Sequence, residues 1–472
     1  MIERRPASDR VRVAMPAVLL FASGAAALVY QVLWIKQLTL IVGVDVFAVT
    51  TAVSAFFGGL AVGGAVIGRR ADRVNRPLRL YALLEAGVAA LSLLTTIALS
   101  HVAAPFAVAE QHAAPLAWGA LFLLVSIPAC LMGGTLPVLV RSVVPRQEAI
   151  GSTGGRLYAA NTLGAIVGVL LTPFLLIPML GVRGASIVAV LVNTAAAVVA
   201  MALDRFQQPG GVTTATGTTG PSSGDARIAI ILYAVSGAIA LGYEVIWSQA
   251  IVQFIGTRSF AFAVVLATYL LGLVIGSALY ARWADRVRDP WSAFGLLIAI
   301  AGLTALLEVA VLGDWLSRLQ IAAGGVALAA TGSFMAEMSA RFVVAAACMV
   351  LLPTLLLGAA FPLMLRLTVD TRHTGRDVGG VVAINTIGGI VGTMIVGFVL
   401  IPTIGLVRSL AALAIAAGGV GVVAAMRSSA GNRPGRWATV IVAAAAVVST
   451  LIIPPDRLAT LLAQARGGSL VF

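Results

Sequence analysis

A glutamate at position 244 stands inside a long apolar run, in the stretch ALGYEVIW that covers residues 240–247. A carboxylate in such a run is expected to take up a proton, because removal from water disfavours its charged form. Tyr243 precedes it and Trp247 follows within one helical turn, and aromatic rings attract organic cations. The pattern predicts a proton or cation site. The alternative is that Glu244 hydrogen-bonds a neighbouring helix while the rings anchor the segment at a membrane interface.

The same motif occurs 213 positions earlier as ALVYQVLW, residues 27–34. Tyr30 and Trp34 repeat the two aromatic residues, and Gln31 stands where the second copy has its glutamate. Glutamine keeps hydrogen-bonding groups but cannot titrate. Only one copy therefore carries the titratable version, and we expect any charge-dependent role to be confined to it.

Other polar residues also fall in apolar runs, where an ionisable group costs about 2.5–3.5 kcal/mol at the bilayer centre on insertion scales. Glu85 is a candidate for binding a substrate or proton, with snorkelling or pairing with a nearby arginine as the alternative. Asn161 and Asn385 occupy matching places in two repeated segments, which favours a structural hydrogen bond, with substrate binding or gating as the alternative. Glu308 lies near the outer end of its run, where contact with solvent is expected.

The composition requires a polytopic membrane protein. Hydrophobic residues make up 60% and charged residues 10% of the 472 positions, with a mean hydropathy of +1.03, far too apolar for one water-soluble core. A bilayer core needs about 20 apolar residues per helix. Thirteen such runs are predicted, near residues 13–35, 43–67, 78–100, 116–140, 157–180, 182–203, 228–252, 258–281, 291–312, 341–365, 378–401, 404–426 and 437–454.

The net charge of +13 follows the membrane rather than a nucleic-acid surface. With a cytoplasmic N-terminus, 23 of the 31 basic residues fall in the N-terminal segment and loops on the cytoplasmic side, as positive-inside topology predicts. We therefore expect an integral protein of a bacterial inner membrane that binds no nucleic acid. The odd number of crossings predicts that residues 455–472 lie on the outer side.

The two cysteines lie in separate apolar runs, so they indicate neither a disulfide framework nor a metal site. No nucleophile–base pair or nucleotide-binding loop stands outside the runs. The sequence predicts no cofactor, no metal and no enzymatic activity.

The chain is duplicated. Residues 23–34 match 236–247 at eight of twelve positions, and 161–181 match 385–405 at eleven of twenty-one. An even number of crossings separates the copies, so the halves should have the same orientation about an axis along the membrane normal. The predicted organisation is a six-helix half (1–206), a flexible cytoplasmic linker rich in Gly, Ser and Thr (207–226), a second six-helix half (227–430), and a further crossing with a short tail (431–472).

Glycines four positions apart recur in matching runs of the two halves and allow helix backbones to approach closely in lipid. They join either the two halves or helices within one half. The pairs are Gly59 and Gly63, Gly164 and Gly168, Gly272 and Gly276, and Gly388 and Gly392.

The loop at residues 68–76, GRRADRVNR, resembles the signature loop of the major facilitator superfamily, a glycine followed by Asp-Arg and a further basic residue. The matching loop RWADRVR, 282–288, has Ala281 where the glycine would stand. The resemblance implies an all-α, major-facilitator-like fold. Each loop contains an Asp-Arg pair, Asp72 with Arg73 in the first and Asp285 with Arg286 in the second. We expect these pairs to hold the cytoplasmic side closed through charge contacts at helix ends.

Three further elements, SGxxALxYExLW, LMGGTLP and RLYAANTLGA, are similar to the membrane region of fused major-facilitator and spermidine-synthase-like proteins over residues 13–430. That family implies a soluble aminopropyltransferase-like domain after the membrane region, but no such domain follows residue 455. Two hypotheses follow. The chain is either a secondary transporter of a small organic cation, for example a polyamine, or a non-transporting membrane scaffold for a separately encoded synthase-like enzyme.

Overall fold

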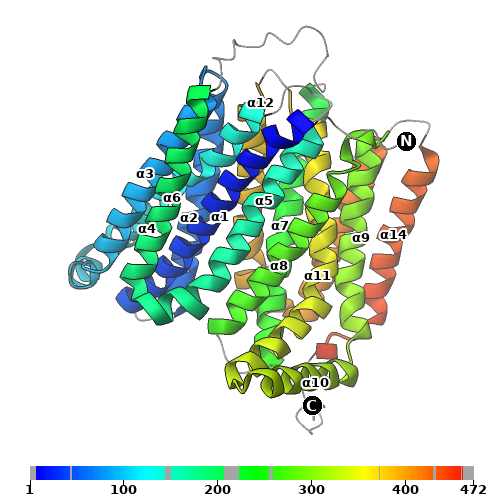
Figure 1. Cartoon of the computed structure of the whole chain (residues 1–472). Coiled ribbons are helices and arrows are strands. Elements are labelled where there is room, and N and C mark those ends of the chain that lie inside the picture. Colours follow the sequence, from blue (N-terminus) through cyan, green and yellow to red (C-terminus); the bar gives the residue numbers. More distant parts are fainter. Residues whose placement is uncertain are drawn as a thin grey trace. The chain divides into compact units, whose positions relative to one another are not determined.

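The structure is a computed structural model, and the residues that it describes form helices joined by short turns and connecting segments, with no strand among them. They are residues 7–42, 45–143, 150–206, 223–254, 259–370, 373–428, 432–458 and 460. The helices (Figure 1) are α1 (Ala7–Val42), α2 (Asp45–Ala71), α3 (Pro77–Leu99), α4 (Ala103–Val143), α5 (Ile150–Leu171), η2 (Thr172–Leu176), α6 (Ile177–Phe206), α7 (Ser223–Phe254), α8 (Ser259–Tyr280), η3 (Ala284–Arg286), α9 (Pro290–Val311), α10 (Asp314–Thr331), α11 (Phe334–Thr368), α12 (Thr374–Met394), η5 (Ile395–Leu400), α13 (Ile401–Met426) and α14 (Arg433–Ile452).

Eleven helical stretches of the described residues are long and apolar enough to cross a membrane. Two of them, Ile150–Arg205 and Thr374–Met426, have 56 and 53 residues, enough for two crossings each. Both contain a glycine with positive φ, Gly181 at 67° and Gly405 at 79°, where the helix breaks and the chain turns back. The described residues therefore supply thirteen helices of crossing length, which confirms the predicted all-α membrane architecture.

The two broken stretches share their irregularities as well as their sequence. A π-helical segment precedes the glycine in each, Thr172–Leu176 before Gly181 and Ile395–Leu400 before Gly405. Both glycines have ψ close to 180°, a backbone conformation that an L side chain disfavours. The duplication predicted from sequence thus extends to local backbone geometry.

The chain divides into two compact units. Unit 1 comprises residues 1–230 and 368–387, and unit 2 comprises residues 231–367 and 388–472. Residues 368–387, placed by the sequence in the second half, pack with unit 1 because the start of α12 contacts α2 and the loop after it. Most of the predicted linker lies outside the described residues.

In unit 1, α1 packs on α5, α2 on α4, and α3 on α6 and α4. Gly59 and Gly63 of α2 face α4, and Gly164 and Gly168 of α5 face α1. A Cβ on Gly63 would collide with the carbonyl oxygen of Cys130. These helix pairs hold together through backbone contact, the arrangement that small residues permit in lipid.

The same device recurs in unit 2. Gly272 and Gly276 of α8 face α11, and Gly388 and Gly392 of α12 face α7. All eight predicted packing glycines thus lie against a helix of the same six-helix half. The structure shows the second of the two interpretations of these residues, packing within a half.

One long helix is not a crossing and was not predicted. α10 runs across the ends of α9 and α11 (Figure 1) and ends at Gly332, which has the left-handed conformation with φ of 64°. Its Gly324 packs against Arg341 and Glu337 of α11, which form an ion pair at 2.5 Å. The sequence of α10 does not predict a crossing, because its 18 residues include charged and polar side chains and form no strongly apolar run.

The final helix, α14, crosses alongside α9. Asp289 caps α9 by accepting a hydrogen bond from the Ser292 amide, and its Oδ2 also accepts one from Asn432 at the start of α14, at 3.0 Å. At the other end, Arg457 donates to the carbonyl of Leu312, just after α9, at 2.7 Å. Because the two helices are tied at both ends, α14 spans the same thickness as α9.

We expect Gly63→Ala to destabilise the protein by about 1–3 kcal/mol, the usual cost of overpacking, because the new Cβ meets the backbone of Cys130. The matched control is Gly119→Ala on α4, where nothing lies within 4 Å of the added Cβ. Thermal melting of the purified protein in detergent compares them. Equal melting temperatures for the two variants would contradict the close contact of α2 and α4.

Candidate functional site

Asp72, in the loop after α2, caps the start of α12. Its Oδ1 accepts a hydrogen bond from the amide of Gly375 at 2.7 Å, and its Oδ2 accepts one from the amide of Arg376 at 2.9 Å. The first amides of a helix have no acceptor within the helix and carry the positive end of its dipole. One carboxylate therefore satisfies two free donors and links two segments about 300 residues apart.

Backbone packing surrounds this cap. Gly64 and Gly68 of α2 meet the backbone of Gly379 and Gly375 of α12. The guanidinium of Arg141, at the end of α4, lies 3.7 Å from Asp72. We call this set, formed by Asp72, its two amide donors, the four glycines and Arg141, the Asp72 clasp. It combines a charge-assisted contact with a backbone approach that any larger side chain would block.

The other three predicted gate residues do not share the surroundings of Asp72. Arg73 and Arg286 are exposed, and Asp285 is half-buried. The loop of the second half is held instead by Arg366, which donates to the carbonyl of Ala284 and, at 2.9 Å, to that of Val287. In unit 1 an aspartate binds helix amides, whereas in unit 2 an arginine binds loop carbonyls.

The aromatic residues of the repeated motif are buried. Tyr30 and Trp34 are fully buried and stack with ring centroids 5.6 Å apart, and the Trp34 indole donates to Thr96 at 3.1 Å. Tyr243 and Trp247 are each 1% exposed. The Tyr243 hydroxyl and the Trp247 indole nitrogen have no hydrogen-bond partner among the described residues.

Glu244 directly follows Tyr243 on α7, and Trp247 lies three residues further on, near the same helix face as Glu244. Glu244 is half-buried, and it makes no ion pair with any described residue. Both rings are buried, so neither has a face exposed for a cation. Gln31, the matching residue of α1, is buried.

Glu85 sits in the interior of unit 1. It is fully buried on α3, and its Oε2 accepts a hydrogen bond of 2.6 Å from Asn193 of α6. Glu85 forms no ion pair with another described residue. The alternatives of snorkelling and of pairing with arginine are therefore not what the structure shows, because the carboxyl points into the helix bundle.

Asn161 packs against Gly24 of α1, where a Cβ would collide with the asparagine backbone and approach its Oδ1. Asn385 is half-buried on α12. The first asparagine thus lies at a helix contact, and the structure describes no such contact for the second.

Glu308 was expected to contact solvent, but one of its carboxyl oxygens is buried and lacks a hydrogen-bond partner among the described residues. It lies within electrostatic range of Tyr243 and Cys348. Its position within a turn of the end of α9 suggested exposure, whereas the structure turns the carboxyl toward α7 and α11. No local sequence signal distinguishes these two orientations.

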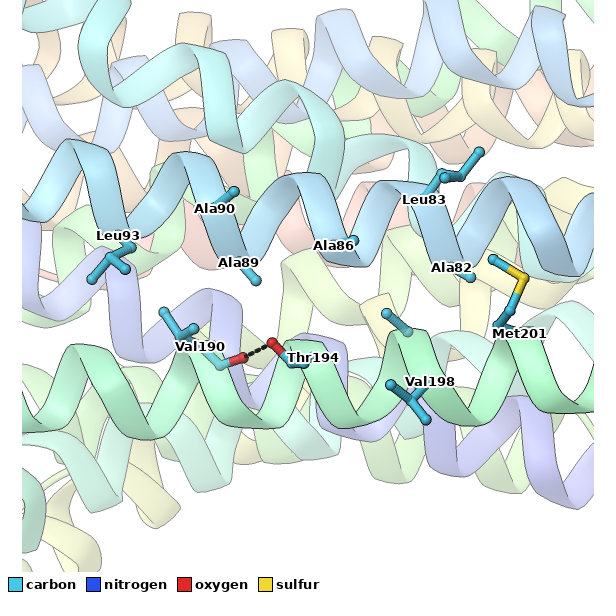
Figure 2. A pocket seen from close by; sticks show the side chains of 11 residues that line it. Ala82, Leu83, Ala86, Ala89, Ala90, Leu93, Val190, Thr194, Val198 and Met201 are labelled. Atoms are coloured by element: carbon cyan, nitrogen blue, oxygen red, sulfur yellow. Dashed lines mark hydrogen bonds between the residues drawn. The ribbon is translucent and has the colours of Figure 1, made fainter.

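An apolar groove of about 490 Å³ runs between α3 and α6 (Figure 2). Its lining includes four alanines of α3, and Thr194 is the one polar side chain among its eleven lining residues. The Thr194 hydroxyl bonds the carbonyl of Val190 in its own helix at 2.8 Å. The groove offers no group to recognise a polar substrate and suits a lipid chain.

No protein-family model matches the chain, and no curated protein matches it. Among solved structures, the fold is similar to the fucose:proton symporter FucP of E. coli, with a TM-score of 0.53 and 14% identity over 89% of this chain and 100% of that one.

A bacterial homologue of the iron transporter ferroportin in its outward-facing state also matches, with a TM-score of 0.53 and 12% identity over 92% of this chain and 99% of that one. The human organic anion transporter MFSD10 matches with a TM-score of 0.51 and 15% identity over 95% of this chain and 100% of that one.

We expect Asp72→Asn to loosen the start of α12, a loss of roughly 1–2 kcal/mol. Asparagine has one acceptor oxygen, so one backbone amide keeps a weaker neutral hydrogen bond while the other faces an NH2 group that cannot accept. Labelling of a cysteine introduced at Gly380, where an added Cβ meets nothing within 4 Å, should accelerate about tenfold in a background without native cysteines. Asp314→Asn on α10 is the matched control. An unchanged labelling rate in Asp72→Asn would count against the Asp72 clasp as a closing contact.

The chain therefore shares the fold of major-facilitator transporters. At these low sequence identities, the similarity concerns the fold alone.

Proposed function

We propose that the protein is a secondary transporter that moves a small organic cation, for example a polyamine, by alternating access. The observation that supports the cation is the set of carboxyls inside the crossings. Glu85, Glu244 and Glu308 all lie in apolar helices, and none forms an ion pair among the described residues.

Unpaired carboxyls favour a positively charged ligand on energetic grounds. An isolated ionised carboxylate away from water is costly, and it is relieved by a proton or by a cation that binds beside it. An anionic substrate would add to the same cost. Of the three carboxyls, Glu85 is fully buried whereas Glu244 and Glu308 are half-buried, and Glu244 is the one that stands in the repeated aromatic motif.

The Asp72 clasp supports the alternating-access part of the proposal. Its two hydrogen bonds involve an ionised group, and such bonds contribute about 1.5–3 kcal/mol each. A contact of this size biases a two-state equilibrium, and a substrate that binds the other state more tightly can reverse the bias.

The proposal is tested by uptake into proteoliposomes with an imposed inside-negative potential. The panel should contain linear polyamines, quaternary amines, neutral sugars and organic anions. We expect saturable uptake of at least one cation class above empty liposomes. Uptake confined to the neutral or anionic compounds would contradict cation transport, and no uptake at all would favour the membrane-scaffold alternative.

We expect Glu244→Gln to lower cation uptake at least tenfold while the protein stays folded, because glutamine preserves shape and hydrogen bonding but removes the charge. The first repeat already carries this residue at Gln31. Glu110→Gln, at an exposed position on α4, is the matched control. Melting temperature and uptake should be measured on the same preparations, and wild-type uptake in the Glu244→Gln protein would exclude the proposed role.

A further inference from the structure

A closed polar cluster lies between α1, α3 and α6 in unit 1, around Glu85. Asn193 donates to its Oε2 at 2.6 Å, and Ser23 and Tyr81 lie beside the carboxyl. The Tyr81 hydroxyl also donates to the carbonyl of Leu19 at 2.9 Å. Glu85, Tyr81, Asn193 and Ser23 are each no more than 5% exposed, so bulk water does not reach the cluster.

Two buried acceptors of the cluster have no donor within the described part of the chain. Glu85 Oε1 and Asn193 Oδ1 are buried and have no hydrogen-bond partner among the described residues, and both are acceptors when the carboxyl is ionised. The buried Tyr30 hydroxyl, which lies within electrostatic range of Glu85, is also unpartnered. A proton on Glu85 Oε1 would turn one of the two unmatched acceptors into a donor.

The charges around Glu85 also favour its protonated form. The titratable groups of the described residues within electrostatic range of Glu85 are Tyr81 on its own helix and Tyr30 on α1, and no basic group is among its neighbours. From α6 the contacting side chain is the neutral Asn193. Closing the cluster around an ionised Glu85 would bury a charge without a counterion, which is strongly unfavourable.

We propose that Glu85 is the site at which the protein binds the proton that drives transport, and that the closed α1–α3–α6 cluster is its proton-bound state. This inference rests on the proposed function, since a driving proton requires a transported substrate. In the step itself a carboxylate takes up one proton to become a carboxylic acid, with no other bond made or broken. Loss of the proton requires water or a cation to enter, and therefore requires the cluster to open.

The surrounding helices are built so that opening is possible. The groove between α3 and α6 (Figure 2) is lined on the α3 side by four small residues, Ala82, Ala86, Ala89 and Ala90. The Glu85–Asn193 hydrogen bond is a polar link between the two helices. A change in the protonation of Glu85 acts directly on that link.

The cluster also adjoins a second candidate residue through α1. Ser23 lies beside Glu85, and the next residue, Gly24, packs directly on Asn161 of α5. A shift of α1 at Ser23 must therefore displace its contact with Asn161. This is a contiguous packed route between the proton and α5, of the kind through which coupling between sites can travel.

The second half has lost this chemistry at matching positions. Ile298 stands in the place of Glu85 and Phe294 in the place of Tyr81, and both are buried. A residue needed only for packing would be equally useful in both halves. The cluster occurs in one half only, which fits the binding of a single proton in each transport cycle.

The test uses Glu85→Gln, which copies the shape of the protonated acid, in the full-length protein in lipid. Infrared spectra of wild type at neutral pH should contain the carbonyl stretch of a protonated carboxylic acid, and this band should be absent from Glu85→Gln. Glu244→Gln and Glu308→Gln are matched controls in which the Glu85 band remains. An unchanged band in Glu85→Gln would show that Glu85 is ionised and would overturn the proposal.

Asn193→Ala supplies a second variant that keeps the acid. Removal of the amide donor should move the same band to higher frequency, because a hydrogen bond to the carbonyl oxygen lowers its stretching frequency. An unshifted band in this variant would contradict the assignment to Glu85. This measurement decides the protonation state even where Glu85→Gln fails to fold.

The coupling of proton movement to substrate transport is measured in a separate experiment. A transported cation is added to vesicles that contain the protein, and the pH inside the vesicles is recorded. Wild type should move protons with substrate, and Glu85→Gln should lose at least 90% of the proton flux while still exchanging substrate across the membrane. Full proton flux in Glu85→Gln would overturn the proposal. A wild-type protein that moves no cation would refute the proposed transport, while the infrared band still reports whether Glu85 holds a proton.

Discussion

The close approach of helix backbones in lipid is the constraint on which the rest of the structure depends. Helices in a bilayer gain little from the hydrophobic effect, so association relies on packing and on hydrogen bonds. Gly63 against Cys130 and Gly164 against Phe21 show backbone meeting backbone, with no space for a Cβ. Gly68 and Gly375 apply the same rule at the Asp72 clasp, where the aspartate can reach helix amides only because the two segments touch.

Because the chain is duplicated, the same helix packing occurs in both halves, while the side chains at matching positions can differ. In unit 1, Arg76 before α3 pairs with Asp204 at the end of α6, at 3.2 Å. In unit 2, the matching positions hold Asp289 and Ser428, which also form a hydrogen bond, at 2.5 Å. The exchange of arginine for aspartate keeps the tie between the two helix ends. It also lets Asp289 bond Asn432, so that the second half holds α14 as well.

Much of the fold was predictable because its determinants are local. Apolar length identifies the crossings, the repeat pairs the halves, and the loop motif singles out Asp72. α10 was missed because it lacks a bilayer-length apolar run, and the assignment of residues 368–387 to unit 1 depends on a contact about 300 residues away in sequence. The surroundings of Glu85 and Glu308 also depend on distant helices. Asn193, the partner of Glu85, is 108 residues away, and nothing near either residue in the sequence indicates which way the carboxyl turns.

The two halves share their helix packing but differ in their polar residues, and unit 1 holds the two polar contacts discussed above. Unit 1 holds both a closed polar cluster at Glu85 and the Asp72 clasp, with α2 and α12 joined by the clasp and α1, α3 and α6 joined at the cluster. α1 packs on α5 through Gly24, Gly164 and Gly168, contacts that leave little room for independent movement of the two helices. A change of charge at Glu85 is therefore felt by α1 and by every helix in backbone contact with it. Interiors this closely packed favour discrete arrangements over gradual deformation, so a single proton can select between states.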